Sequence, residues 1–410
     1  MSSSLPLAGI RVADFTWVIA GPYGTYLLAR MGAEVIKIEG LDPIDHIRDN
    51  PPFAGNVPGP NRSGFFNMLN AGKKSVTLQL TDAEHLRIAK EIVAASDVVV
   101  ESFSYGTMEK FGLGYDELRR VKPDIILVSC SGFGQEGRDR TLRAFMGTVH
   151  AYTGLNSING YAGGPPKPAG GTLADYATGV MLVFAVLAAL RHRRRTGAGQ
   201  HIDLAMADVV LSTMGAAFMD YFMNGRVVSP RGNRSDHAAP NNVYRCRGDD
   251  AWVAISVERD EQWQALCDVI GDAGLRRPEY IDEAGRRRHA AEIDARISAW
   301  SNARLALEAA EQLQAAGVPA GPSSSAGDLL EQPQLRARGF FVAPEHPEVG
   351  RREIPNLPWR LGGDVPCAPA PLLGEHNDEV LRTLLGRSQD DVDRLNAQRD
   401  AALRGTSPAH

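Results

Sequence analysis

The sequence contains little cysteine, and its four cysteines lie far apart at Cys130, Cys246, Cys267 and Cys367. None forms a CxxC motif or stands near a histidine with metal-ligand spacing, so the pattern indicates neither a zinc site nor a disulfide scaffold. The chain also has no excess of basic residues: its net charge is -5 and its pI is about 6.1. We therefore expect no metal, no nucleic-acid partner and a reducing, cytoplasmic location.

Long apolar runs are lacking as well. The longest extends from Val180 to Leu190, well below the roughly 20 residues that a membrane span needs. The N-terminal stretch MSSSLPLAGIRV has neither the basic region nor the apolar region of a secretion signal. We expect a protein that is neither exported nor inserted in a membrane.

Common catalytic signatures are absent too: the chain has no GxSxG, HExxH, Walker A or EF-hand pattern. The first predicted strand-to-helix turn reads AGPYGTY, where a dinucleotide-binding fold would carry GxGxxG. This turn argues against a nicotinamide cofactor, although Glu39 closes the second strand as a ribose-binding acid would.

What the 410 residues do contain is an ordinary globular composition, 43% hydrophobic and 23% charged, enough for two or three domains. Strand and helix patterns alternate along the first half. We predict strands at Ile10–Phe15, Glu34–Glu39, Ser75–Leu80, Val98–Val100, Asp124–Ser129 and His201–Leu204, with helices between them, including one that Thr81 caps with Glu84 as a capping box. This alternation predicts a doubly wound α/β domain.

The composition shifts at residues 224–240, which are rich in Gly, Pro, Arg and Asn. We predict a large domain over residues 1–223, a linker and smaller α+β domain over 224–326, and a C-terminal segment over 327–410 that returns to the large domain. Apolar residues from about Asp208 to Met223 predict a single further helix in the large domain.

The stretch Pro165–Gln200 combines a Pro/Gly loop, one acid and a buried helix. The apolar run without a polar stripe predicts a helix buried on every side. Asp175 stands where the loop meets the helix, so it is expected either to cap the helix or, in an enzyme, to act as a nucleophile towards an acyl group. On the local pattern alone, the cap is favoured.

Several ordered segments resemble those of the class III CoA-transferases, which include carnitine and formyl-CoA transferases and the related α-methylacyl-CoA racemases. The segments are IRVADFTWVIAGPYGTYLLARMGAEVIKIE, NAGKKSVTL, VVVESFSYGTMEKFGLGYDEL, ILVSCSGFGQEG, GGTLADYATGV, RTGAGQHIDLAMADVV and LLGEHNDEVL, and they extend from about Leu7 to Leu385. The resemblance implies a Rossmann-like large domain that holds coenzyme A, a smaller domain, and an interlocked homodimer.

The resemblance also assigns residues. It places Asp175 at the catalytic aspartate and makes coenzyme A a substrate, with no tightly bound cofactor. It implies coenzyme A contacts at Val18, Ala20, Leu78, Ser102, Phe103, Lys110 and Arg143.

Departures from the family limit the substrate. Formyl-CoA transferases carry glutamine where this chain has Ile19 and tyrosine where it has Phe145, which argues against oxalate as the acceptor. Racemases pair their aspartate with a histidine at the place of Phe145, and His150 is expected on another helix face. Arg231, Arg234 and His237 hint at a second carboxylate, and thus at a dicarboxylic acid, although basic residues in a linker are commonly solvated.

We therefore predict an acyl-CoA:carboxylate CoA-transferase that acts through an aspartyl anhydride and an aspartyl-CoA thioester. Two alternatives remain open at this point: racemase-like α-proton chemistry, and a non-catalytic nucleotide-binding protein.

Overall fold

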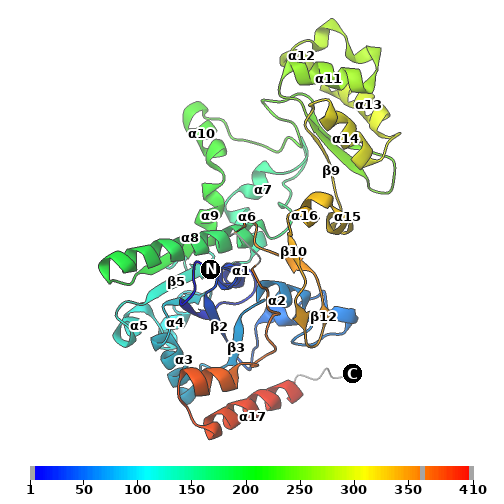
Figure 1. Ribbon diagram of the computed structural model, residues 1–410. Helices are drawn as coiled ribbons and strands as arrows, with labels where there is room; N and C mark the ends of the chain where they lie inside the picture. Colours follow the sequence, from blue (N-terminus) through cyan, green and yellow to red (C-terminus); the bar gives the residue numbers. More distant parts are fainter. Residues whose placement is uncertain (1–4, 361–364, 406–410) are drawn as a thin grey trace. The chain divides into compact units, whose positions relative to one another are not determined.

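The computed structural model describes residues 5–360 and 365–405, which form two compact units (Figure 1). The first contains the described residues up to Asn156, then Pro168–Val227, and those from Gly339 onward. The second contains Ser157–Lys167 and Val228–Arg338. The chain thus leaves the first unit and comes back to it, while the domain bounds 1–223, 224–326 and 327–410 stay a prediction.

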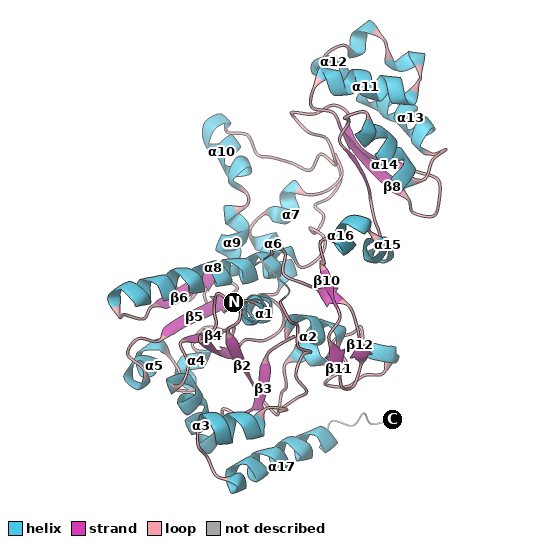
Figure 2. Cartoon of the chain, viewed as in Figure 1, coloured by secondary structure: helices cyan, strands magenta, loops and turns pink. Residues whose placement is uncertain are grey.

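A six-stranded sheet forms the centre of the first unit (Figure 2). Every neighbouring pair of strands is parallel, and the strand order is β3-β2-β1-β4-β5-β6. From β1 the chain adds β2 and β3 on one side, and it then adds β4, β5 and β6 on the other side. The strands are β1 (Arg11–Phe15), β2 (Glu34–Glu39), β3 (Lys74–Thr77), β4 (Val98–Glu101), β5 (Ile126–Ser131) and β6 (His201–Ala205). The predicted α/β fold with a parallel sheet is confirmed.

Helices cover both faces of this sheet, as the apolar character of its strands requires. On one face, α1 (Ala20–Arg30) and α8 (Leu173–Thr196) pack on residues such as Val12, Val98 and Val128. On the other, α3 (Ala83–Ala94), α5 (Tyr115–Val121) and the C-terminal α17 (Gln389–Gly405) enclose a second cluster. Alternate strand residues therefore fill two separate cores.

Shorter elements complete the first unit. They are η1 (His46–Asp49), η2 (Ala54–Asn56), α2 (Gly64–Leu69), α4 (Thr107–Lys110), α6 (Met146–Tyr152), α9 (Met206–Ser212), α10 (Gly215–Asn224), β10 (Phe341–Val342), β11 (Glu345–His346), β12 (Gly350–Arg351), β13 (Ile354–Pro355) and the π-helix η5 (Glu379–Leu384). A further helix, α7 (Leu155–Ile158), spans the boundary with the second unit.

The second unit is an α+β arrangement with its own core. Its antiparallel sheet has the order β7-β8-β9, and large side chains such as Trp263 and Tyr280 lie in the core between sheet and helices. Its elements are β7 (Asn241–Arg245), β8 (Trp252–Ser256), α11 (Asp260–Ile270), η3 (Ala273–Leu275), η4 (Pro278–Tyr280), α12 (Glu283–Arg288), α13 (Ala290–Ser301), α14 (Ala306–Ala315), β9 (Ala320–Pro322), α15 (Ala326–Glu331) and α16 (Pro333–Ala337).

Two glycines allow α1 and α8 to cross closely. A Cβ atom on Gly179 would lie 2.9 Å from the carbonyl oxygen of Ala20 and 3.0 Å from the amide nitrogen of Gly24. A Cβ atom on Gly24 would in turn lie 3.0 Å from the carbonyl oxygen of Gly179. Because neither helix has a side chain at the crossing, their backbones approach each other, and this fixes the start of α8 relative to the start of α1.

The prediction that the Val180–Leu190 run is buried on every side is wrong. Leu182 and Val186 are fully buried, but Phe184 on the other side of α8 is 67% exposed. By length and composition, α8 is apolar enough to cross a membrane, yet a core helix passes the same test. The inner face of α8 packs on α1 and the sheet, whereas its outer apolar face is uncovered in the single chain.

Two local predictions are also wrong. Asp82, and not Thr81, caps α3, because its carboxylate accepts hydrogen bonds from the backbone N–H groups of Glu84 and His85. The helix predicted from Asp208 to Met223 is two helices, α9 and α10, since the chain turns at Thr213–Met214. Within the predicted C-terminal segment 327–410, residues 361–364 and 406–410 lie outside the described residues.

The close crossing of α1 and α8 predicts that a larger residue at position 179 destabilises the fold. Gly179→Ala should lower the free energy of unfolding by about 1–3 kcal/mol, because the added methyl group meets backbone atoms that cannot rotate away. Gly147→Ala in α6 is the matched control, since a Cβ atom there has no neighbour within 4 Å. Urea denaturation of both variants measures the difference, and equal stabilities would contradict a crossing that requires glycine.

Candidate active site

A cleft of about 350 Å³ lies at the carboxyl ends of β1, β4 and β5, where the strand order reverses. Ligands of doubly wound sheets bind at this edge, in the crevice between oppositely directed crossovers. Most of the lining residues follow one of those strands: Trp17, Val18, Ile19, Ala20, Ser102, Phe103, Ser104, Tyr105, Gly132, Arg140, Leu142, Arg143, Ala144, Phe145 and Met146. The others are His46 in η1, Cys130 and Ser131 at the end of β5, Asp175 in the first turn of α8, and Met206 at the start of α9.

The loop after β1 forms one wall. Its backbone is unusual, because Val18 has φ +68°, a left-handed conformation that β-branched residues rarely adopt. The next residues begin α1, whose first N–H groups have no partner within the helix and are suited to polar or anionic ligand atoms.

The loop after β4 forms the next wall and is tied to the first. The hydroxyl of Ser102 accepts a hydrogen bond of 2.8 Å from the N–H of Trp17. The carboxyl group of Glu101 accepts one of 2.7 Å from the N–H of Phe103. Burial raises the pKa of Glu101 to about 7, although hydrogen bonds from Ser129 and Phe103 favour its ionised form. The hydroxyl of Ser102 therefore links the two loops, whereas the carboxyl group of Glu101 holds the loop after β4 to its own strand.

Asp175 projects into the cleft from the first turn of α8. The N-cap position belongs to Thr172, whose side chain makes no capping hydrogen bond, so the expectation that Asp175 serves as the cap is wrong. Only 7% of Asp175 is exposed, and burial raises its pKa from 3.8 to about 6. At neutral pH it is thus mainly a carboxylate with little hydration, which favours nucleophilic reaction.

Two buried oxygen atoms of the cleft have no hydrogen-bond partner among the described residues: Oδ2 of Asp175 and Oγ of Ser131 at the end of β5. Unsatisfied buried polar atoms are rare, and in a cleft they mark groups available to a ligand. The neighbouring Cys130 does not supply a second nucleophile, since burial, together with the charges of Glu101 and Asp175, raises the pKa of its thiol to about 12.

Comparison with known sequences and structures identifies the family. The sequence model of CoA-transferase family III matches residues 7–377. The chain belongs to this family.

Relatives include the succinyl-CoA–D-citramalate CoA-transferase of Chloroflexus aurantiacus, 32% identical over 96% of this chain and 98% of the relative. The succinate–glutarate CoA-transferase of Agrobacterium fabrum is 35% identical over 92% and 96%. A solved CAIB/BAIF family protein from Brucella suis superposes with a TM-score of 0.85 at 28% identity, covering 93% of this chain and all of that protein. This protein is therefore a CoA-transferase.

The structure of this CoA-transferase brings six of the eight predicted site residues to one cleft: Val18, Ala20, Ser102, Phe103, Arg143 and Asp175. Leu78 and Lys110 do not line it. Leu78 is fully buried in the core behind β3. Lys110 is an exposed residue at the end of α4.

Sequence reasoning missed other lining residues, chiefly Trp17, His46, Tyr105, Ser131 and Arg140. The rings of Trp17 and His46 meet edge to face at 5.5 Å, and the guanidinium of Arg140 lies 4.6 Å from the ring centre of Tyr105. The only available signal was position, because most of them follow a predicted strand at its carboxyl end.

Other residues that bear on substrate choice in the sequence are Phe145, His150, Arg231 and Arg234, and of these only Phe145 lines the cleft. Phe145 lines the cleft and is 69% exposed, whereas His150 is fully buried in α6 and does not line it. In the second unit, Arg231 pairs with Asp236 at 2.5 Å, and Arg234 lies 4.0 Å from Asp294. Both arginines thus have a carboxylate beside them within their own unit.

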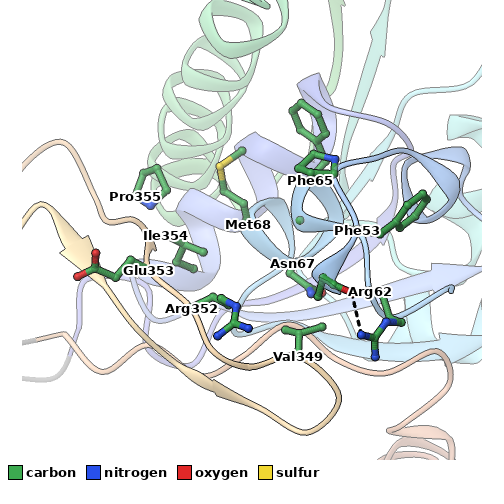
Figure 3. A pocket seen from close by; sticks show the side chains of 13 residues that line it. Phe53, Arg62, Phe65, Asn67, Met68, Val349, Arg352, Glu353, Ile354 and Pro355 are labelled. Atoms are coloured by element: carbon green, nitrogen blue, oxygen red, sulfur yellow. Dashed lines mark hydrogen bonds between the residues drawn. The ribbon is translucent and has the colours of Figure 1, made fainter. Parts of the chain in front are cut away.

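A second cavity of about 380 Å³ lies in the first unit between α2 and the C-terminal β-segment (Figure 3). Apolar side chains, among them Phe65, Met68 and Ile354, dominate its lining, with Arg352 at one side. None of the predicted site residues lines it. Across the described residues, no group of three or more His, Cys, Asp or Glu is arranged to hold a metal.

The raised pKa of Asp175 makes stability depend on pH. Ionisation of Asp175 costs folding free energy because its pKa is higher in the folded chain than in the unfolded chain, from 3.8 to about 6. The cost is absent below pH 3.8, grows between pH 3.8 and 6, and is constant above.

Asp175→Asn should therefore raise the free energy of unfolding at pH 8 by at most about 3 kcal/mol, and the gain should shrink as the pH approaches 4. Urea denaturation at pH 8, 6 and 4.5 measures this dependence. The exposed Asp249→Asn serves as the control for an aspartate outside the cleft. A pH-independent effect at Asp175 would contradict the desolvated carboxylate.

Proposed function

We propose that this CoA-transferase moves coenzyme A from a donor acyl-CoA to an acceptor carboxylic acid, with Asp175 as the covalent nucleophile. One observation carries the proposal: a nearly buried carboxylate, with one oxygen unpaired, stands in a cleft at the ligand-binding edge of the sheet. Such a group can attack a thioester without a general base, because it is already ionised at neutral pH.

In the proposed reaction, the Asp175 carboxylate attacks the thioester carbonyl, and coenzyme A leaves as a thiolate from a mixed anhydride. The thiolate attacks the aspartyl carbonyl, which releases the donor acid and leaves an aspartyl-CoA thioester. The acceptor carboxylate then attacks this thioester to form a second anhydride, and the returning thiolate yields the new acyl-CoA and free Asp175. The same carboxylate returns at the end, so neither ATP nor water is consumed.

Coenzyme A would lie along the wall made by the loops after β1 and β4 in a Rossmann-like domain. Val18, Ala20, Ser102 and Phe103 would contact it mainly through the backbone, and the cation of Arg143 suits a phosphate. Leu78 and Lys110 remain proposed contacts outside the cleft. Binding of the remote nucleotide would hold the thioester close to Asp175, with coenzyme A as a substrate and not a resident cofactor.

The acceptor we propose is a dicarboxylic acid. Both relatives described above carry dicarboxylic acids in their names, citramalate and glutarate. Arg140 and Arg143 both line the cleft and could pair with a second carboxylate.

The α-proton alternative requires a second proton carrier opposite Asp175. The place of the racemase histidine is occupied by Phe145, and His150 does not line the cleft. His46 does line it, with its ring against Trp17. Exchange of the substrate α-hydrogen with deuterated solvent in the absence of an acceptor, lost on His46→Asn, would favour this chemistry over CoA transfer.

We further propose an interlocked homodimer in the cytoplasm. The outer face of α8 exposes Phe184, and α10 has no buried residue yet carries Phe222, which is 75% exposed. A second subunit would remove this apolar surface from water. The four free cysteines suit a reducing compartment. Light scattering that finds a monomer at assay concentrations would overturn the dimer.

Asp175→Asn should reduce transfer at least about a thousandfold while CoA binding persists, because the amide cannot form the anhydride. Wild-type enzyme treated with succinyl-CoA and then hydroxylamine should carry a hydroxamate on the peptide that contains Asp175, detected by mass spectrometry. Asp208→Asn, an exposed acid in the first turn of α9, is the control. Full transferase activity of Asp175→Asn would falsify the mechanism.

A panel of acceptor acids tests the substrate class. With succinyl-CoA as donor, kcat/KM should be at least about tenfold higher for a C4 or C5 dicarboxylate than for the monocarboxylate of equal length, since one added charge-assisted contact contributes about 1.4 kcal/mol or more. Equal values for the two acids would refute recognition of a second carboxylate.

A further inference from the structure

Three fully buried ion pairs lie beneath the loop that follows β1. They are Asp14 with Lys73 at 3.0 Å, Lys37 with Asp45 at 2.9 Å, and Glu39 with Arg48 at 2.8 Å. A buried ion pair seldom stabilises a fold more than apolar residues in the same place would. These pairs are therefore more important for the geometry that they impose than for the free energy of folding.

The Lys37–Asp45 pair contacts the loop directly from both partners. Nζ of Lys37 donates a 2.7 Å hydrogen bond to the carbonyl oxygen of Thr16. Oδ1 of Asp45 accepts one of 3.0 Å from the N–H of Val18, while Oδ2 accepts from Lys37. The pair thus forms hydrogen bonds to the backbone on both sides of Trp17, at Thr16 and at Val18.

Val18 is also the residue of this loop whose backbone conformation requires stabilisation by its surroundings. Its φ of +68° is unfavourable for a β-branched residue and persists only where the surroundings impose it. The next residues, Ile19 and Ala20, line the cleft and begin α1. If Val18 relaxed to an extended conformation, the chain would leave the cleft wall at this point.

We propose that Lys37 and Asp45 are positioning residues of the active site, which hold Val18 in its left-handed conformation and so shape the coenzyme A wall. The inference rests on the proposed function, because it assigns coenzyme A to the loop after β1. It adds a cause for the loop's shape: the ion pair holds Asp45 in place, and Asp45 holds the N–H of Val18.

Asp45→Asn is the informative substitution. The side chain keeps its size, but an amide places an NH2 donor where one of the two carboxylate oxygens stood. The position that faces Val18 and Ile47 and the position that faces Lys37 therefore cannot both accept hydrogen bonds. The Kd for coenzyme A, measured by calorimetry on the full chain, should rise about tenfold, which corresponds to about 1.4 kcal/mol.

Glycine at position 18 separates positioning from general structural support. Glycine adopts positive φ without strain, so the loop no longer needs to be held. In a Val18→Gly background, Asp45→Asn should therefore raise the Kd by less than about threefold, since the two effects are coupled. An equal rise in both backgrounds would overturn the proposal.

A matched control is Glu39→Gln, which disturbs a buried pair that does not bond to the loop. Its effect on the Kd should be the same whether valine or glycine occupies position 18. Should Asp45→Asn fail to fold, the charge-neutral Lys37→Met/Asp45→Leu variant replaces the whole pair by apolar residues and should show the same coupling.

The outcomes also separate the two proposals. A wild-type chain that does not bind coenzyme A would overturn the proposed function and the positioning role together. A wild-type chain that binds coenzyme A, with no coupling between positions 45 and 18, would overturn the positioning role alone.

Discussion

The cleft depends on charges that are entirely removed from water. Asp14, Lys37, Glu39, Asp45, Arg48 and Lys73 are all buried around the ends of β1 and β2, and each also bonds to groups beyond its ion-pair partner. Removing six charges from water is costly, and the compensation comes only if the geometry is kept, because an unpaired buried charge is strongly unfavourable. Such a network therefore resists small displacements. The loop after β1 is held rigid by the same network, because the backbones of Thr16 and Val18 form hydrogen bonds with it.

A second constraint acts on the opposite side of the same loop. The crossing of α1 and α8 at Gly24 and Gly179 brings the first turns of the two helices to one cleft. Asp175 is thereby held in a nearly dry position, where its ionisation is unfavourable for the fold but would favour the proposed attack on a thioester. Rigid ion pairs on one side and a close helix crossing on the other leave Asp175 little freedom to move, which in the proposed reaction would lower the entropy lost in reaching the reactive geometry.

Sequence periodicity was sufficient to predict the six parallel strands and the acid at the start of α8, since apolar patterning is a local property. It could not predict the ion pairs. Lys37 lies inside the strand EVIKIE, where an alternating pattern favours a solvated lysine, and its partner Asp45 stands in a loop eight residues later. The positive φ of Val18 leaves no trace in the sequence, because β-branched residues normally avoid it. The prediction of a fully buried α8 failed for a related reason: an apolar face indicates that something covers it, and does not say whether the cover belongs to the same chain.

That last point connects assembly with chemistry. Leu173 and Phe184 are exposed on the helix that carries Asp175, one of them two residues before it and the other nine residues after it. In the proposed dimer, the partner would cover the outer face of α8 while the inner face stays packed on α1. Desolvation is what raises the pKa of Asp175, so additional low-dielectric surface near the first turn would raise it further and make the carboxylate a stronger base. The reactivity of the proposed nucleophile would then be set partly by the fold of one chain and partly by the contact between two.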